Sequence, residues 1–308
     1  MKATGAGKDS KNNEIGGGFM CTALALRSDR LWFGRTLDIE EPYGETVVLA
    51  PRLFPFRFRH AGARDRGLAM LGAAHLHRGV PLYYDAVNEC GLAMAALRFP
   101  KYAVYRPASG KESVASFELI PYLLGLCRSM TEAKERLEGL SIADGAVSDE
   151  LRTTPLHWLL SDGRRSLVIE PLASGLAVTE APLGVLTNAP PYAEQLENPA
   201  LQTLHREHAE GLPGDFSSPS RFARMAYVRQ NARGVSTPER CFHLLDTVTV
   251  PHGCATGIEG RPISTRYTAC IDLSRGIYYS ATDTRRSLRE AHLFAFDLET
   301  AALSTFPL

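Results

Sequence analysis

The stretch Met20-Cys21-Thr-Ala-Leu-Ala-Leu26, with Phe33-Gly-Arg-Thr-Leu-Asp-Ile-Glu40 a few residues later, decides the fold, because the composition of the chain changes abruptly at its start. Residues 1–19 are polar and rich in glycine, whereas the two stretches have the apolar, strand-like composition of buried elements. We therefore expect the ordered fold to begin at Cys21 and residues 21–308 to form one domain.

Residues 1–20 have two interpretations. The peptide Glu14-Ile-Gly-Gly-Gly-Phe-Met20 is what a purine-rich, GGAGG-type ribosome-binding site ahead of an ATG codon encodes. On that basis we expect Met20 to be the true start and residues 1–20 to be a non-native extension. The alternative is a flexible tail or a short pro-segment. The segment has no apolar stretch of the kind that a signal peptide contains.

Cys21 becomes the first residue if Met20 is the initiator, because methionine is removed ahead of small second residues. One residue then carries both a thiol and a free α-amine. An α-amine, with a reference pKa of about 7.7–8.0, is a competent base for a thiol of pKa about 8.5 without a histidine partner. Taken alone, a small buried cysteine that opens a core strand is the better interpretation of Cys21. Motifs elsewhere in the chain reverse that preference.

Charge and hydrophobicity exclude several classes of function. The 308 residues contain 34 Lys and Arg against 34 Asp and Glu, and 44% are hydrophobic, as in ordinary globular proteins. A neutral chain without runs of basic residues lacks the charge that binding to a nucleic-acid backbone needs. The longest strongly apolar window, residues 117–127, is too short to span a bilayer. We therefore expect neither a nucleic acid nor a membrane as a partner.

The cysteines and histidines do not form a recognisable metal or disulfide pattern. The six cysteines are spread along the chain without a C-x-x-C pair, so we expect no disulfide framework and a reducing, cytoplasmic location. His205-x-x-His208 lacks a zincin glutamate, and His75-Leu-His77 lacks a third ligand. We interpret the first pair as a solvated helical face and the second as exposed loop residues. The sequence therefore predicts no metal site and no cofactor.

Hydrophobic periodicity predicts blocks of strands separated by pairs of helices. Tight turns and alternating apolar residues favour strands over residues 22–27, 31–35, 46–49, 81–87, 92–99, 156–160, 166–170, 176–179, 185–187, 266–273, 276–282 and 291–296. Helical spacing favours residues 117–127, 131–140, 220–230 and 236–248, with capping boxes expected at Ser129-x-x-Glu132 and Ser236-x-x-Glu239. This block pattern is typical of an α+β fold in which helices cover antiparallel sheets.

Seven motifs identify the family that the chain resembles. They are Cys21-Thr-x-Leu-Ala-Leu, Phe33-Gly-Arg-x-x-Asp-Ile-Glu40, Asn88-Glu-x-Gly-Leu, Thr153-Thr-x-Leu-His-Trp-x-x-Ser-Asp162, Gly184-Val-Leu-Thr-Asn-x-Pro190, Gly211-Leu-Pro-Gly-Asp-Phe-x-x-x-Ser-Arg-Phe222 and Tyr267-Thr-x-Cys270. In order and spacing they closely resemble the choloylglycine hydrolase family of bile salt hydrolases and penicillin V acylases, which are N-terminal-nucleophile (Ntn) hydrolases. The resemblance implies a four-layer αββα sandwich with two antiparallel sheets and, in solution, a homotetramer.

The resemblance also implies a role for each matching residue. Cys21 matches the nucleophile, and Asp38 and Arg35 match residues that hold its α-amine and favour its thiolate. Asn188 matches an asparagine that donates to the oxyanion, and Arg221 matches an arginine near the nucleophile and the substrate. Without Cys21 these residues have ordinary interpretations: a surface ion pair, an Asx turn before a proline, and an arginine in the first turn of a helix.

Arg98 departs from the pattern of the family. It stands in Ala96-Leu-Arg-Phe-Pro100, where bile salt hydrolases have asparagine and penicillin acylases have tyrosine. A guanidinium there suggests binding of a substrate carboxylate or sulfonate, which glycine and taurine conjugates carry. The resemblance as a whole implies an amidase for conjugated bile salts. The alternatives are an acylase for penicillin V or another N-acyl amide and, if Cys21 keeps its extension, an inactive binding relative.

Overall fold

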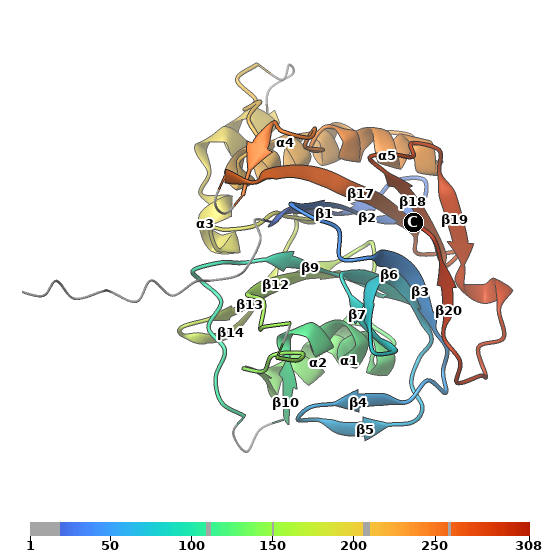
Figure 1. Cartoon of the computed structure of the whole chain (residues 1–308). Helices are drawn as coiled ribbons and strands as arrows, with labels where there is room; N and C mark the ends of the chain where they lie inside the picture. Colours follow the sequence, from blue (N-terminus) through green and yellow to red (C-terminus); the bar gives the residue numbers. More distant parts are fainter. Residues whose placement is uncertain (1–18, 109–111, 150, 206–209, 258–259) are drawn as a thin grey trace, which may run out of the picture.

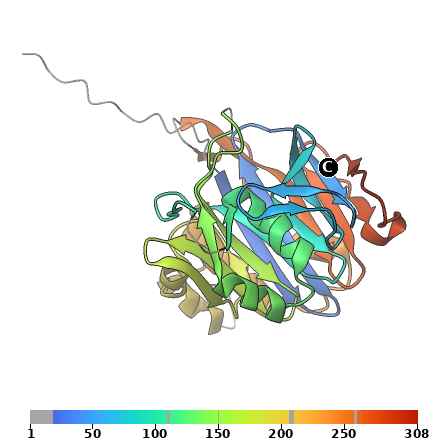
Figure 2. The ribbon, with the colours of Figure 1, turned by 90° about the horizontal axis from the view of Figure 1, so that it is seen from below.

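Two large antiparallel sheets stack face to face, and helices cover the outer face of each (Figures 1 and 2). The computed structural model describes residues 19–108, 112–149, 151–205, 210–257 and 260–308. The layers follow the order helices, sheet, sheet, helices, so the predicted αββα sandwich is confirmed. The expected start at Met20 concerns residues 1–18, which lie outside the described ranges.

The first sheet carries the N-terminal strand of the described chain. In spatial order its strands are β15 (Val185–Leu186), β1 (Phe19–Arg27), β2 (Leu31–Ile39), β17 (Pro262–Asp272), β18 (Ile277–Thr282) and β19 (Arg289–His292), and β16 (Ala255–Thr256) pairs with β17. On its outer face lie α4 (Ser218–Asn231) and α5 (Pro238–Asp246) (Figure 1). Strand β1 begins at Phe19, three residues before the strand predicted over residues 22–27, and Met20 pairs with Asp38 of β2.

The second sheet lies beneath the first. In spatial order its strands are β14 (Gly175–Glu180), β13 (Ser166–Leu172), β12 (Leu156–Ser161), β9 (Ala93–Arg98), β8 (Asp85–Asn88), β6 (Met70–His77), β3 (Glu45–Ala50) and β20 (Ser304–Phe306), and β7 (Val80–Tyr83) pairs with β6. Helices α1 (Leu119–Leu126) and α2 (Met130–Glu138) cover its outer face (Figure 2).

Smaller elements complete the described chain. These are the pair β4 (Phe56–Phe58) and β5 (Gly62–Arg64), the parallel pair β10 (Glu112–Ala115) and β11 (Leu140–Ala143), helix α3 (Tyr192–Leu196), and the 3₁₀ turns η1 (Ser116–Glu118), η2 (Pro199–His205) and η4 (Leu293–Ala295). None of the helices in the described ranges has the length and apolar content that crossing a bilayer requires.

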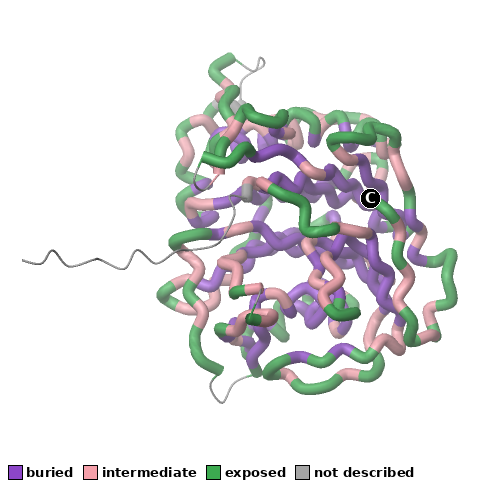
Figure 3. The backbone as a smooth tube through the Cα atoms, in the orientation of Figure 1, coloured by how far each residue is buried: buried purple, intermediate pink, exposed green. Residues whose placement is uncertain are grey.

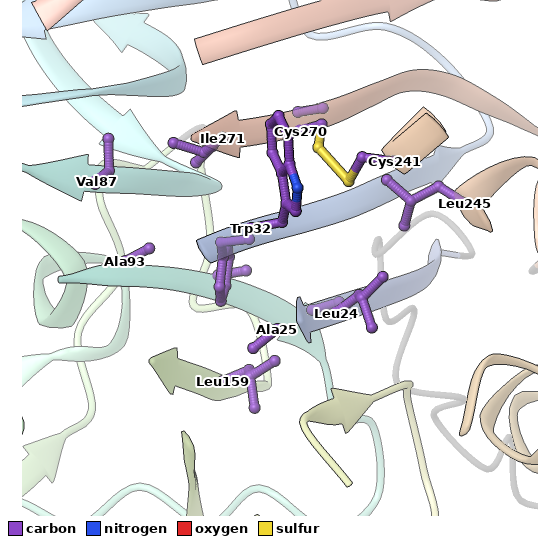
Figure 4. Close-up of a cluster of buried hydrophobic side chains, with 14 of the residues drawn as sticks. Leu24, Ala25, Trp32, Val87, Ala93, Leu159, Cys241, Leu245, Cys270 and Ile271 are labelled. Carbon is purple, nitrogen blue, oxygen red and sulfur yellow. A yellow bond between two sulfur atoms is a disulfide. The ribbon is translucent and has the colours of Figure 1, made fainter. Parts of the chain in front are cut away.

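The core explains why β1 and β2 have continuous rather than alternating apolar sequences. Both strands lie between the α4–α5 layer and the second sheet, so side chains on both faces are buried (Figure 3). Trp32 and Leu24 lie among the fully buried side chains of this core (Figure 4). At Gly34 a Cβ atom would stand 2.7 Å from a methyl carbon of Leu245, so glycine allows α5 to approach β2 closely.

One disulfide contradicts the expectation drawn from cysteine spacing. Cys241 of α5 and Cys270 of β17 form a disulfide beneath the outer helices (Figure 4). Helix packing brings together two residues 29 positions apart, and no local motif indicates such a pairing. The prediction of no disulfide was therefore wrong for this pair, and the cysteine pattern no longer argues for a reducing compartment.

The helix caps and one strand refine other predictions. The Ser129 hydroxyl caps α2 by accepting from the Glu132 N–H, as its motif predicts. Helix α5 is capped by Thr237 instead of the expected Ser236. His75 and His77 belong to β6, so the prediction that they lie in an exposed loop was wrong. Of the other histidine pair, His208 lies outside the described residues.

Candidate active site

The pairing of β1 with β2 brings three of the predicted residues together. Cys21 lies opposite Leu37, and Arg35, two positions earlier on β2, points to the same face of the sheet as Cys21. The Arg35 Nη2 donates to the Cys21 Sγ at 3.1 Å. Asp38 is one position further along β2, so its side chain points to the opposite face, toward α4. The two sides of Cys21 therefore meet different charges.

The Cys21 thiol is buried in a protein environment, with 2% of the residue exposed. Burial raises the pKa of the thiol above its ordinary value, and the Arg35 guanidinium acts against that rise. Desolvation disfavours an unpaired thiolate, so the resting group is a neutral thiol. Using it as a nucleophile requires a base that removes its proton.

Asp38 is fully buried beneath α4 and receives hydrogen bonds from two hydroxyl groups. The Thr265 hydroxyl donates to Oδ1 at 2.6 Å and the Thr36 hydroxyl to Oδ2 at 3.5 Å. Burial raises the pKa of Asp38 to about 6, against the opposing charge of Arg221. The sequence-based alternative of a surface ion pair is excluded, because neither Arg35 nor Asp38 reaches the surface.

Asn188 holds the main chain of Cys21. The Cys21 backbone N–H donates to the Asn188 Oδ1 at 2.8 Å, and this nitrogen is a peptide nitrogen because Met20 precedes it. The Asn188 Nδ2 donates to the Arg98 carbonyl oxygen at 2.9 Å. Asn188 therefore connects the end of β9 with the residue expected to be the nucleophile.

Arg221 fastens the same strand from the helix layer. Its Nη1 donates to the Cys21 carbonyl oxygen at 2.5 Å and to the Thr22 hydroxyl at 2.8 Å. Its Nη2 donates to the Asn188 Oδ1 at 2.8 Å. The guanidinium is fully buried, and burial lowers its pKa while the Asp38 charge raises it. Arg221 lies in the first turns of α4, but its contacts go far beyond those of an ordinary helix residue.

Sequence reasoning assigned no role to His157, which supports the Asn188 segment from beneath. The buried imidazole contacts the Glu170 carboxylate through Nδ1 at 3.1 Å and the Thr187 carbonyl oxygen through Nε2 at 2.8 Å. The Phe99 ring stacks on it, with ring centroids 4.2 Å apart. His157 lay in a quoted family motif, but its partners come from separate strands, so sequence alone gave no sign of this contact.

Metal-ligand clusters are absent from the described part of the chain. Among the described residues, no group of three or more His, Cys, Asp or Glu side chains is arranged to hold a metal ion.

Arg98, the other predicted residue, ends β9 and is half-buried, with its backbone carbonyl bound to Asn188 as described above. The site is therefore an arrangement of thiol, guanidinium, carboxylate and amide groups, which suits acyl transfer.

Comparison with known proteins decides the family. The family model for linear amide C–N hydrolases, choloylglycine hydrolase family, matches residues 21–306. The chain belongs to this family. Its match begins at Cys21 and takes in all the site residues described above.

Two curated relatives and two solved structures agree with this membership. The bile salt hydrolase/transferase of Lactiplantibacillus plantarum is 35% identical over 94% of this chain and 97% of its own, and that of Bifidobacterium longum is 32% identical over 92% and 98%. A variant of the conjugated bile acid hydrolase of Clostridium perfringens superposes with a TM-score of 0.87, at 28% identity over 94% of this chain and 97% of its own. The penicillin V acylase of Agrobacterium tumefaciens, at 22% identity, a TM-score of 0.77 and coverage of 93% and 90%, shares the fold.

Proposed function

We propose that this choloylglycine hydrolase family member cleaves the amide bond of glycine- or taurine-conjugated bile salts, with Cys21 as an N-terminal nucleophile. The observation that carries the proposal is the 3.1 Å contact of the Arg35 guanidinium with the Cys21 sulfur. Asn188 and Arg221 fix the nitrogen and the carbonyl oxygen of the same residue. The names of the relatives above support the substrate class.

The first half of the reaction forms a thioester. Once the residues before Cys21 are removed, its nitrogen becomes an α-amine that accepts the thiol proton. The sulfur attacks the amide carbonyl carbon, and the C–N bond breaks after the α-ammonium returns the proton to the leaving nitrogen. Free glycine or taurine departs. Asp38 lies on the neighbouring strand β2, and we assign its carboxylate to stabilising the α-ammonium while that group carries the proton.

The second half releases the bile acid. A water molecule gives one proton to the α-amine as its oxygen attacks the thioester carbonyl. The C–S bond then breaks as the α-ammonium passes this proton to the sulfur, which regenerates the Cys21 thiol and releases the carboxylic acid. Asn188 stabilises the oxyanion of both steps. Its amide nitrogen carries two hydrogens, one of which binds the Arg98 carbonyl, and we assign the other to the oxyanion.

Asn188→Ala is expected to lower kcat by about 10²–10³-fold, the usual effect of losing one oxyanion donor. The variant also removes the acceptor for the Cys21 nitrogen. Both losses affect the chemical step and not the binding of the intact substrate, so KM for the bile salt should change less than kcat. Steady-state kinetics on glycocholate measure both values. The matched control is Asn198→Ala, because Asn198 also donates to a backbone carbonyl but lies at the surface. Equal rates for the two variants would contradict the assigned role.

We assign Arg98 to the anionic end of the substrate. Its guanidinium lies close enough to the Tyr43 phenol to oppose the rise in pKa that burial causes there. Tyr43 is 42% exposed and Arg98 is half-buried, so a carboxylate or sulfonate can approach this pair from the Tyr43 side. The contact of Arg98 with Asn188 is made by its backbone carbonyl, so a change of the side chain leaves that contact intact.

Arg98→Ala is expected to raise KM about tenfold for glycocholate and taurocholate and to leave kcat nearly unchanged. This is the pattern when the lost contact binds the substrate and the transition state equally well. The alanine variant keeps the carbonyl that binds Asn188. The control substrate is the cholate amide of ethanolamine, which has no negative charge and whose KM should not change. A parallel fall of kcat and kcat/KM would instead assign Arg98 to the oxyanion, and unchanged kinetics would show that its side chain points to solvent.

The substrate class is tested by assaying glycocholate, taurocholate and penicillin V side by side. We expect the two bile salts to have the higher kcat/KM. A higher value for penicillin V would favour the alternative acylase. A purified chain that by intact mass keeps residues 1–20 and hydrolyses none of the three substrates would favour the inactive binding relative. The homotetramer stays a prediction of the family resemblance, and light scattering of the purified protein measures it.

A further inference from the structure

A buried carboxylate lies behind Arg35, on the opposite sheet. Asp85 begins β8 of the second sheet and is fully buried. Its Oδ2 stands 3.5 Å from the Arg35 Nη1, and the same Nη1 donates to the Tyr84 carbonyl oxygen at 2.9 Å. The Arg35 guanidinium therefore has one nitrogen on the second sheet and the other on the Cys21 sulfur.

Two tyrosines of the first sheet complete the arrangement. The Tyr267 hydroxyl donates to the Asp85 Oδ2 at 2.5 Å, and the Tyr278 hydroxyl donates to Oδ1 at 2.7 Å. Both phenols are buried, which raises the pKa of each well above its ordinary value, so both remain donors. The Arg35 guanidinium also lies 5.8 Å from the centre of the Tyr267 ring.

The hydrogen-bond donors around Asp85 favour its ionised form. Burial raises the pKa of its carboxyl group, and the Arg35 charge, the two phenols and a backbone N–H of Ala73 all act against that rise. A carboxylate that accepts several hydrogen bonds beside a cation is the form that such surroundings stabilise.

The charges around the thiol come from both sheets and from the helix layer. Arg35 of β2 contacts the Cys21 sulfur, whereas Asp38 of β2 and Arg221 of α4 act on the thiol through their charges. The Tyr84 phenol also lies within electrostatic reach of Cys21. With Asp85 included, the groups around the thiol are the cations Arg35 and Arg221 and the carboxylates Asp38 and Asp85. The Arg35 charge acts against the rise in thiol pKa that burial causes, and a negative charge on Asp85 partly cancels that action of Arg35.

We propose that Asp85 is a positioning residue that anchors the Arg35 guanidinium against the Cys21 thiol and, through its negative charge, keeps that thiol protonated until the α-amine accepts the proton. This inference rests on the proposed role of Cys21 as the nucleophile. A thiol that keeps its proton has one to pass through the α-amine to the leaving nitrogen, and its thiolate, once formed, is a stronger nucleophile than that of a more acidic thiol.

The test measures the pH dependence of Cys21 alkylation by iodoacetamide in the purified chain. Mass spectrometry of the Cys21 peptide separates its modification from that of the exposed Cys90 and Cys254. In Asp85→Asn we expect the midpoint to fall by about one pH unit, which is about tenfold faster alkylation below the midpoint. Alkylation needs the thiol but no turnover, so this readout is independent of whether bile salts are hydrolysed.

Asp272→Asn is the matched control. Asp272 is also fully buried and paired with an arginine, Arg30, at 2.7 Å, but it lies in register with Trp32, three residues along β2 from Arg35. The pH midpoint of Cys21 alkylation in Asp272→Asn should equal that of the protein without a substitution. If Asp85→Asn folds, as judged by thermal melting, and its midpoint is unchanged or rises, the proposal is wrong.

Tyr278→Phe keeps the proposal testable if Asp85→Asn fails to fold. Losing one donor destabilises the Asp85 carboxylate, so the midpoint should fall in the same direction by a smaller amount. Tyr279→Phe is its control, because Tyr279 follows directly on β18 and points to the other face of the sheet. A Tyr278→Phe profile that matches the Tyr279→Phe profile would overturn the role of the carboxylate.

Discussion

Cys21→Ser is expected to lower the rate of glycocholate hydrolysis by about 10⁴-fold or more, the order of loss seen when a covalent nucleophile is disabled. The serine hydroxyl is close in size to the thiol, and Arg35 would still face it. A hydroxyl is far less acidic, however, so an α-amine of ordinary basicity cannot generate enough alkoxide. The loss should appear in kcat, measured as release of free glycine, while bile salt binding to the variant persists.

The other cysteines provide the control for this prediction. Cys90→Ser and Cys254→Ser change exposed thiols, and both variants should keep full activity. One stoichiometric iodoacetamide adduct at Cys21 should in turn abolish hydrolysis by the unchanged protein. Substantial turnover by Cys21→Ser, or inactivation by an adduct at another cysteine, would remove Cys21 from the proposed mechanism.

The sequence predicted the elements that carry the site because their signals are local. The apolar stretches of β1 and β2 are buried on both faces, and the serine and glutamate that open α2 form the expected cap. The five residues assigned through family motifs also lie close together in space. Cys21 is hydrogen-bonded to Arg35, Asn188 and Arg221, and Asp38 lies on the neighbouring strand β2, where its charge acts on the Cys21 thiol. The family resemblance implied these neighbours even though 167 positions separate Cys21 from Asn188.

Interactions that depend on how the two sheets stack were not predictable. Strand β6 was missed because Gly72 and its small neighbours are typical of a turn, whereas a Cβ there would stand 2.0 Å from the Asp85 carbonyl oxygen. The Asp85 carboxylate meets phenols 182 and 193 positions away. The disulfide between Cys241 and Cys270 likewise follows from the packing of α5 on β17. Each is a pairing between layers, and periodicity within one element does not specify its partner.

Retaining Met20 ahead of Cys21 is expected to lower kcat by about 10⁴-fold, near the upper limit for general acid–base catalysis. In the chain described here the Cys21 nitrogen belongs to a peptide bond, and its N–H donates to Asn188. A peptide nitrogen is not basic, so it can neither accept the thiol proton nor deliver one to the leaving amine. The thiol, Arg35 and the oxyanion donor would all remain in place, which isolates the contribution of the base.

The measurement compares two chains that differ by one residue. A cleavable N-terminal fusion is cut in vitro to expose Cys21 in one preparation and Met20 in the other, and intact mass verifies each product. Because β1 already begins at Phe19 and Met20 pairs with Asp38, the longer chain should fold equally well, and equal melting temperatures would confirm this. Iodoacetamide should still alkylate Cys21 in both. Full activity of the Met20 form would show that a group other than the α-amine is the base, and Asp38, a buried carboxylate of β2 whose charge acts on the Cys21 thiol, would then be the residue to test.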